Sequence, residues 1–420
     1  MRMVRFAAVL LYVLGTCTGG PRKGYGPGMQ DWGFVEVRKG AHMFWWLYYT
    51  TADVQKFSDR PLIIWLQGGP GSSSQYGNFL ELGPQTLEGD ERNHTWVRSY
   101  NVLFIDSPVG AGFSYVEDES LFRKTNAEIA DDLLIFTKEF YRLNPEFKRT
   151  TLHIYTESYG GKMVPEFAYV LHNAIQKGEI DVKLESVVLI APWVSPIDSI
   201  LSYPDFLLNM GFVDTQGYKK IQFAVTETER ILNEERFEEA YLKLRETYHM
   251  IRQTLEIDFY NVLRQPKSDS AIRLDYRNPN FYNSMRGQIA KTLQLPSESV
   301  FGAQEYNVSR SLNGDHLRPV THIVELLLNN TDVEVVVITG QLDFIIATPG
   351  NVAWLDKLQW KGRSGYLEAP RIGVGPHGLL EGYQKSFGKL SVYWALRAGH
   401  LVPVDNPFVM DYVLRKHARY

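Results

Sequence analysis

Residues 152–161 read Leu-His-Ile-Tyr-Thr-Glu-Ser-Tyr-Gly-Gly, an apolar run that ends at Ser158 and is followed by two glycines. This pattern is typical of a nucleophile elbow, in which a strand turns sharply at a serine and a helix follows, here from near Lys162. Small residues belong beside such a turn because the strand and the helix pack closely there. The usual form is G-x-S-x-G, and Thr156 stands in place of the first glycine. An ordinary helix cap at a strand–helix junction is the alternative interpretation of this serine.

The segments around the elbow predict a layered α/β fold. Short apolar runs at 61–66, 101–105, 187–190 and 333–338 are typical of strands that are buried on both faces. Helical periodicity covers 125–143 and continues from the elbow to about residue 177, whereas 29–51 alternates as antiparallel strands do. Strands that alternate with helices indicate a mostly parallel sheet covered by helices.

A long segment interrupts this pattern. Residues 215–263 predict a long amphipathic helix, residues 264–318 are polar and irregular, and the buried-strand pattern returns at 333. We therefore expect a core formed by 21–199 and 319–420, with a helical cap inserted at 200–318.

Two later segments complete a catalytic pattern. Asp343 follows the strand predicted to end at residue 338, and His400 lies in a glycine-marked loop after the run 390–396. Serine, acid and histidine in this order are the chain order of the α/β-hydrolase fold. The serine needs an imidazole to take its proton, and the imidazole needs a carboxylate to fix its tautomer. An oxyanion hole also needs unobstructed N–H groups, for which Gly69 and Tyr159 are the candidates.

The N-terminus and the composition indicate a secretory route. Residues 1–20 carry early arginines, an apolar run of nine residues and then small residues, as a signal peptide does. The single cysteine, Cys17, lies inside that segment, so the mature chain would hold no disulfide. Three sequons begin at the asparagines Asn93, Asn307 and Asn329 and predict glycosylation. We expect a secreted or lysosomal protein.

Several partner classes are excluded by the same properties. A net charge of −4 over 420 residues gives no sign of nucleic-acid binding. No apolar run reaches the length of about 18 residues that a membrane anchor needs. Residues 373–378 match G-x-G-x-x-G, but no helix is predicted after them, and His316 and His322 lack metal-ligand spacing. The sequence predicts neither a cofactor nor a metal.

The motifs resemble those of one enzyme family, the serine carboxypeptidases. The resemblance is carried by Trp-Leu-Gln-Gly-Gly-Pro-Gly at 65–71, Asp-Ser-Pro-Val-Gly-Ala-Gly-Phe-Ser-Tyr at 106–115 and the segments around the three triad residues. They occur in order between residues 30 and 410. The resemblance implies that peptide or protein C-termini are the substrates.

The resemblance also implies a site for the substrate's terminal carboxylate. In this family two glutamates and an asparagine hold that group, and they correspond here to Glu81, Glu157 and Gln67, with Gly68 beside them. Two neighbouring carboxyls share a proton, so one of them can donate a hydrogen bond to a carboxylate. Binding should weaken toward neutral pH. The family's asparagine is replaced by Gln67, and its usual cysteine after Gly71 is Ser72.

The predicted function is that of a serine carboxypeptidase that works through an acyl-enzyme at acidic pH. Two alternatives stay open at this point. One is an acyltransferase of the same fold, in which an alcohol replaces water. The other is a catalytically weak homologue that acts as a binding protein. The oligomeric state is not predicted.

Overall fold

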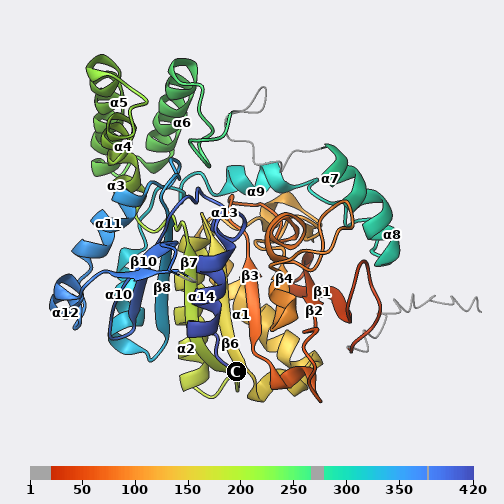
Figure 1. Ribbon diagram of the computed structural model, residues 1–420. Helices are drawn as coiled ribbons and strands as arrows, with labels where there is room; N and C mark the ends of the chain where they lie inside the picture. The colour runs from red at the N-terminus through yellow and green to blue at the C-terminus, as the bar shows by residue number, and fades with distance from the viewer. Residues whose placement is uncertain (1–19, 266–278, 376–377) are drawn as a thin grey trace, which may run out of the picture.

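A single sheet runs through the computed structural model, which describes residues 20–265, 279–375 and 378–420 (Figure 1). Residues 1–19 of the predicted signal peptide lie outside these residues. The 11-stranded sheet has the order β1-β2-β4-β3-β6-β7-β8-β11-β10-β9, and β5 pairs with β2. The strands are β1 (Gln30–Arg38), β2 (Ala41–Tyr48), β3 (Leu62–Leu66), β4 (Asn101–Ile105), β5 (Tyr115–Val116), β6 (Thr151–Glu157), β7 (Lys183–Ile190), β8 (Glu334–Gly340), β9 (Ile372–Val374), β10 (Gly382–Phe387) and β11 (Leu390–Ala395).

The centre of the sheet is parallel and its edges are antiparallel. The run β4-β3-β6-β7-β8-β11 pairs in parallel throughout, whereas β1, β2, β9 and β10 pair antiparallel to their neighbours. This arrangement confirms the expected mostly parallel sheet and antiparallel opening. Because parallel strands share one direction, the loops after β3, β6, β8 and β11 meet at one edge.

Helices cover both faces of the sheet. On one face, α1 (Asn126–Leu143), α2 (Gly160–Gln176) and α10 (Thr321–Asn330) pack on alternate strand residues such as Ile154 and Val337. On the other face, α14 (Pro407–His417) packs on the intervening residues, such as Tyr155 and Ile338. The alternation that divides these two cores follows from the period of two along each strand. The remaining core helices are α11 (Thr348–Lys357), α12 (Arg363–Glu368) and α13 (Val402–Asp405).

The inserted segment contains more helices than its sequence predicts. The helix α3 (Pro196–Leu201) leads into it, and its α-helices are α4 (Tyr203–Asn209), α5 (Thr215–Asn233), α6 (Phe237–Thr254), α7 (Pro279–Ser284), α8 (Ala290–Thr292) and α9 (Glu305–Ser311). The single long helix expected over 215–263 is wrong. The chain turns at Glu235, which has φ +59°, and leaves helical geometry after Thr254. Thus α5 and α6 form an antiparallel pair.

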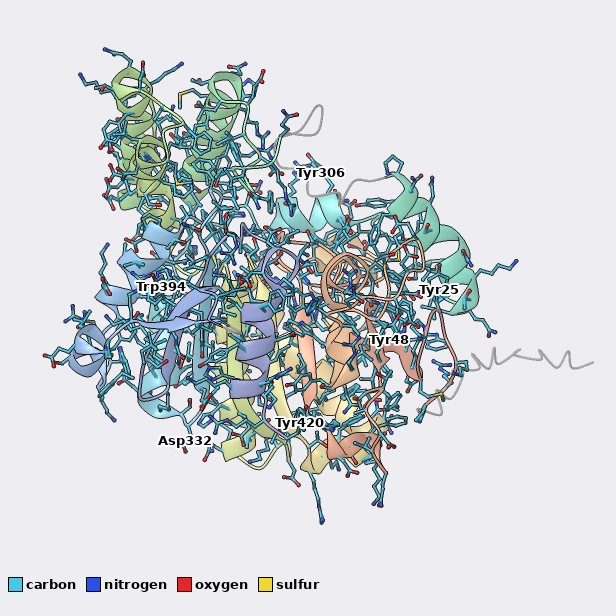
Figure 2. All side chains as sticks on the ribbon, in the orientation of Figure 1. Tyr25, Tyr48, Tyr306, Asp332, Trp394 and Tyr420 are labelled. Carbon is cyan, nitrogen blue, oxygen red and sulfur yellow. The ribbon has the colours of Figure 1, made fainter. Side chains whose placement is uncertain are left out.

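Most of the inserted helices lie at one end of the molecule. In Figure 1, α5 and α6 stand above the sheet, α9 lies across the same end, and α7 and α8 run down the right-hand side. Figure 2 places Tyr306 of α9 at this end and Tyr420 at the opposite end. Part of the segment nevertheless belongs to the core, because Phe281 and Phe301 are buried among the aromatic residues of the first strands. No helix among the described residues is long and apolar enough to cross a membrane.

Candidate active site

Ser158 lies at the turn between β6 and α2. Its φ of +62° is the left-handed geometry of a nucleophile elbow, which non-glycine residues adopt only when the surroundings impose it. A Cβ atom on Gly68 would lie 2.6 Å from the Cβ of Ser158 and 2.9 Å from the backbone nitrogen of Tyr159. The loop after β3 therefore touches the elbow directly and tolerates only glycine at this point. Thr156, the departure from the usual pentapeptide, donates its hydroxyl to the carbonyl of Leu66 over 2.6 Å and ties β6 to β3.

Asp343 and His400 form a buried pair at the same edge of the sheet. Asp343 lies in the loop after β8, His400 lies in the loop after β11, and their exposed fractions are 0% and 1%. The distance from His400 Nδ1 to Asp343 Oδ2 is 2.8 Å, while Asp343 Oδ1 accepts from the N–H of Ile346 over 3.0 Å. With Nδ1 directed at the carboxylate, Nε2 can act as the base. Nε2 is buried and has no hydrogen-bond partner among the described residues, so no Ser158–His400 bond is formed in this state.

Two backbone N–H groups beside Ser158 remain available for an anion. Within the described part of the chain, neither the N–H of Gly69 nor that of Tyr159 donates to a backbone carbonyl. Both flank the point where the loop after β3 meets the elbow. Such a pair of unobstructed donors can stabilise a developing oxyanion.

A buried carboxylate that the sequence interpretation did not single out braces this loop. Asp106 Oδ1 accepts from Ser73 Oγ over 2.6 Å and from the N–H of Ser74 over 2.8 Å, and Oδ2 accepts from the N–H of Phe113 over 2.9 Å. Burial raises the pKa of Asp106 to about 6. The sequence motif at 106–115 begins with Asp106, but it did not indicate which groups would hydrogen-bond to this carboxylate. Asp106 fixes the loop that carries Gly68 and Gly69.

Glu81, Glu157 and Gln67 form a second buried cluster next to Ser158. Gln67 Nε2 donates to Glu81 Oε1 over 3.2 Å and to Glu157 Oε1 over 3.1 Å. Its Oε1 accepts from Trp65 Nε1 over 2.8 Å and from the N–H of Gly77 over 3.1 Å, so both ends of the amide are held. All three polar side chains are at most 3% exposed. The structure thus brings the predicted carboxylate-binding residues together.

The two glutamates cannot both be ionised at acidic pH. Burial raises the pKa of Glu81 to about 7. Burial, followed by the charge of Glu81, raises the pKa of Glu157 well above its ordinary range. The Oε2 atoms of Glu81 and Glu157 are buried and have no hydrogen-bond partner among the described residues. A proton shared by the pair, and donors aimed at an incoming carboxylate, would satisfy these atoms.

A short piece of the inserted segment, residues 259–262, joins the two loops that carry the Asp343–His400 pair. We call these residues the strap. The carbonyl of Phe259 accepts from the N–H of Phe344 over 3.1 Å and from that of Ile345 over 3.0 Å. The carbonyl of Tyr260 accepts from the N–H of His400 over 2.6 Å, and the Tyr260 ring lies edge-on to the imidazole with centroids 4.7 Å apart. The strap therefore fixes both loops, a role that no sequence motif indicated.

Asp405 anchors the strap to the histidine loop. Its Oδ2 accepts from the N–H of Gly399 over 2.8 Å and from Asn261 Nδ2 over 2.9 Å, and its Oδ1 is paired with Arg264. The Asp405 side chain is 6% exposed. The carboxylate thus holds the residue before His400 against the strap.

The three asparagines of the predicted glycosylation sites differ in how accessible their side chains are. Asn93 is exposed, whereas the amide nitrogen of Asn307 donates to Glu119 over 2.9 Å and that of Asn329 donates to the carbonyl of Gln359 over 3.2 Å. Asn93 is therefore the sequon best placed to carry a glycan. No group of metal-ligating side chains occurs in the described residues.

Comparison with known proteins gives a consistent result over nearly the whole chain. A family model described as serine carboxypeptidase matches residues 21–417. The retinoid-inducible serine carboxypeptidase of Mus musculus is 35% identical, with 96% of this chain and 95% of that protein covered. The serine carboxypeptidase-like 51 protein of Arabidopsis thaliana is 33% identical over 96% of this chain and 95% of its own length. The crystal structure of a prohormone-processing carboxypeptidase from Saccharomyces cerevisiae superposes with a TM-score of 0.82 at 22% identity, covering 93% of this chain and 91% of that one.

Proposed function

The chain belongs to the serine carboxypeptidase family and is a serine-type carboxypeptidase, and from this premise we propose that Ser158, His400 and Asp343 carry out its reaction. Ser158 Oγ attacks the carbonyl carbon of the last peptide bond while its proton moves to His400 Nε2. Asp343 holds the imidazole in the tautomer that leaves Nε2 as the acceptor. The observation that carries this assignment is the buried contact of 2.8 Å between His400 Nδ1 and Asp343 Oδ2 beside an elbow serine with φ +62°.

The remaining steps use the same groups. The N–H groups of Gly69 and Tyr159 stabilise the negative charge on the former carbonyl oxygen. When the C–N bond breaks, His400 returns its proton to the leaving amine, and the terminal amino acid departs. Water then attacks the acyl-enzyme with His400 as base, which releases the shortened peptide and restores Ser158.

We propose that Glu81 and Glu157 recognise the free terminal carboxylate. At acidic pH the pair holds its protons and donates to the substrate, whereas ionisation of Glu81 near pH 7 would leave charge repulsion. Gln67 uses both hydrogens of its amide on the glutamates. We therefore assign it the alignment of the pair, with Gly68 allowing the close approach to Ser158.

We propose the following organisation and location for the chain. Residues 200–318 form a cap over the site, carried by the core parts 21–199 and 319–420. The predicted signal peptide, the exposed sequon at Asn93 and a carboxylate site that favours low pH support a secreted or lysosomal location.

One comparison tests the proposed function. Purified protein is given two N-blocked dipeptides that differ only in a free or amidated C-terminus, from about pH 4 to 7.5, with Ser158→Ala as control. We expect Ser158-dependent release from the free acid only, fading toward neutral pH. Release from both substrates would remove the carboxylate-binding role, and ester formation with an added alcohol in place of hydrolysis would favour an acyltransferase. Absence of any Ser158-dependent product would favour a binding protein.

A further inference from the structure

Helix α6 carries two arginines that have no ion-pair partner among the described residues, Arg245 and Arg252. They are seven positions apart, which is close to two helical turns, so both lie on one side of the helix about 10 Å apart. Arg245 is exposed and Arg252 is half-buried. Both are therefore cations whose charge nothing in the described protein neutralises by contact.

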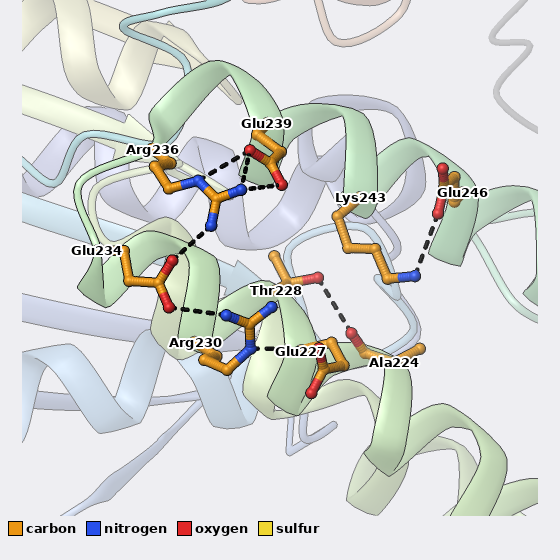
Figure 3. A network of polar contacts seen from close by, with 9 residues as sticks. All are labelled: Ala224, Glu227, Thr228, Arg230, Glu234, Arg236, Glu239, Lys243 and Glu246. Atoms are coloured by element: carbon orange, nitrogen blue, oxygen red, sulfur yellow. Dashed lines mark hydrogen bonds and ion pairs between the residues drawn. The ribbon is translucent and has the colours of Figure 1, made fainter.

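Three other basic residues on or beside this helix pair, Arg230, Arg236 and Lys243, form ion pairs with glutamates, as Figure 3 shows. Arg230 is 3.3 Å from Glu227 and 2.7 Å from Glu234. Arg236 also contacts Glu234, at 2.5 Å, and Lys243 lies 3.1 Å from Glu246. Acidic partners are thus plentiful on this pair of helices. Arg245 and Arg252 nevertheless form no ion pair with an acidic residue in the described part of the chain.

The side of α6 that carries Arg245 and Arg252 faces the catalytic loops. The guanidinium carbon of Arg252 lies 5.3 Å from the ring centroid of Phe259 in the strap. One turn before Arg245, the ring of Tyr241 lies 4.6 Å from His316, and His316 in turn lies 5.4 Å from Tyr159. Tyr159 follows the nucleophile, and the strap contacts the imidazole. Arg252 therefore lies against the strap. Burial lowers the pKa of the His316 imidazole, and Arg245 is near enough for its charge to help lower it.

Arg252 also has an unmet hydrogen-bonding demand. Its Nε and Nη2 atoms are buried and have no acceptor in the described part of the chain. Burial lowers the pKa of the guanidinium, but arginine stays charged over the whole working range. A buried donor without a partner costs free energy, and an anion brought to this position would remove that cost. A carboxylate suits the planar fork of an arginine because it can accept two parallel hydrogen bonds.

We propose that Arg245 and Arg252 bind an acidic side chain of the substrate, in the residue before the scissile bond. This inference rests on the proposed function. The terminal carboxylate is assigned to Glu81 and Glu157, so the residue that is released lies on their side of Ser158. The acyl part of the peptide then lies on the side of Tyr159, toward which α6 turns Arg245. The preferred substrates are peptides with glutamate or aspartate next to the last residue.

Kinetics on matched peptides test this preference. N-blocked dipeptides with glutamate, glutamine or lysine before a common C-terminal leucine are compared at about pH 5.5, where a glutamate side chain is ionised. We expect kcat/KM to be about tenfold higher for glutamate than for glutamine, the ratio that one charge-assisted hydrogen bond provides, and lowest for lysine. Arg245→Gln and Arg252→Gln should each bring the glutamate-to-glutamine ratio toward one. The paired, outward-facing Arg230→Gln is the matched loss of charge and should keep the wild-type ratio.

Two results would overturn the proposal. One is a wild-type ratio near one, or a ratio that survives in both the Arg245 and the Arg252 variants. The other is a preference for glutamate in the released residue, which would refute the assignment to the acyl side. Hydrolysis of the glutamine peptide without any preference would leave the carboxypeptidase function standing.

A binding measurement separates this inference from the catalytic one. Ser158→Ala is titrated with the same three peptides by calorimetry, and the glutamate peptide should bind about tenfold more tightly than the glutamine peptide. If wild type hydrolyses no peptide, the proposed function fails, and this ratio decides the arginine site alone. Equal dissociation constants in Ser158→Ala would refute it.

Discussion

Replacing Glu81 by glutamine should abolish the loss of substrate affinity above neutral pH. Burial raises the pKa of Glu81 to about 7, so the carboxyl is protonated at pH 5 and ionised at pH 8. A glutamine has almost the same shape and can still accept from Gln67, but it carries no charge at any of these pH values. At pH 5 the variant and the wild type should therefore have similar KM values for a free-acid dipeptide.

The loss of substrate affinity can be estimated from the charge repulsion between Glu81 and the bound carboxylate. An ionised Glu81 and a substrate carboxylate about 4 Å away repel by about 4 kcal/mol at an effective dielectric constant of about 20. This repulsion corresponds to a loss of affinity of about a thousandfold. Since each pH unit above 7 lowers the protonated fraction of Glu81 about tenfold, the wild-type KM should rise about tenfold per unit up to that limit. The Glu81→Gln value should stay level.

The assay measures KM and kcat separately from pH 5 to 9 on a free-acid dipeptide and on its amide. Glu166→Gln is the control, because Glu166 is a carboxyl in α2 whose pKa is also raised by burial but which does not contact Glu81 or Glu157. It should retain the wild-type profile. A Glu81→Gln variant whose KM climbs in parallel with the wild type above pH 7 would refute the assignment of the titrating group.

Four shorter predictions concern the same edge of the sheet. Asp343→Asn should lower kcat by about 10⁴ with a small change in KM, because the imidazole would lose its tautomer; retained kcat in steady-state assays would contradict this. Gly68→Ala should prevent labelling of Ser158 by a fluorophosphonate, since its Cβ would lie 2.6 Å from that of Ser158. Asp405→Ala leaves the N–H of Gly399 unpaired, and a misplaced His400 should reduce kcat about tenfold or more while KM holds. For Glu305, burial raises the pKa to about 7, so the stability it supports at low pH is lost as the pH rises toward 7; thermal unfolding of Glu305→Gln should show a smaller drop in Tm from pH 5 to 7.5 than wild type.

The core and its catalytic edge were predictable because local patterns determine them. A strand buried on both faces favours an unbroken apolar run, and β3, which precedes the loop of Gly68 and Gly69, has one. The residues after such strands must meet at one edge, so the loops with Asp343 and His400 could be placed from chain order. The shared environment of Glu81 and Glu157 came from resemblance alone, since neither residue follows a pattern that spacing explains.

The inserted segment was harder to predict for a physical reason. The break between α5 and α6 falls at Glu235, where no glycine or proline marks it, and the positive φ there is imposed by the packing of the two helices. The strap could not be inferred either, because it acts through backbone carbonyls that any residue would provide. Its partners at 342–345 and 400 are distant in the sequence. The assignment of 200–318 to a cap remains a prediction.

The strap has a consequence for how this enzyme could be rebuilt. Because Phe259 and Tyr260 hydrogen-bond to the loops of Asp343 and His400, the insertion is not an independent module set on a finished hydrolase. In a chimaera that exchanges the whole insertion for that of a relative, the strap that contacts the loops of Asp343 and His400 would come from the other protein. Exchanges that are confined to α5 and α6 and end before residue 255 would change specificity and leave the positions of Asp343 and His400 unchanged. Selection acting on substrate range is therefore expected to vary the α5–α6 pair freely while it leaves the segment that follows unchanged.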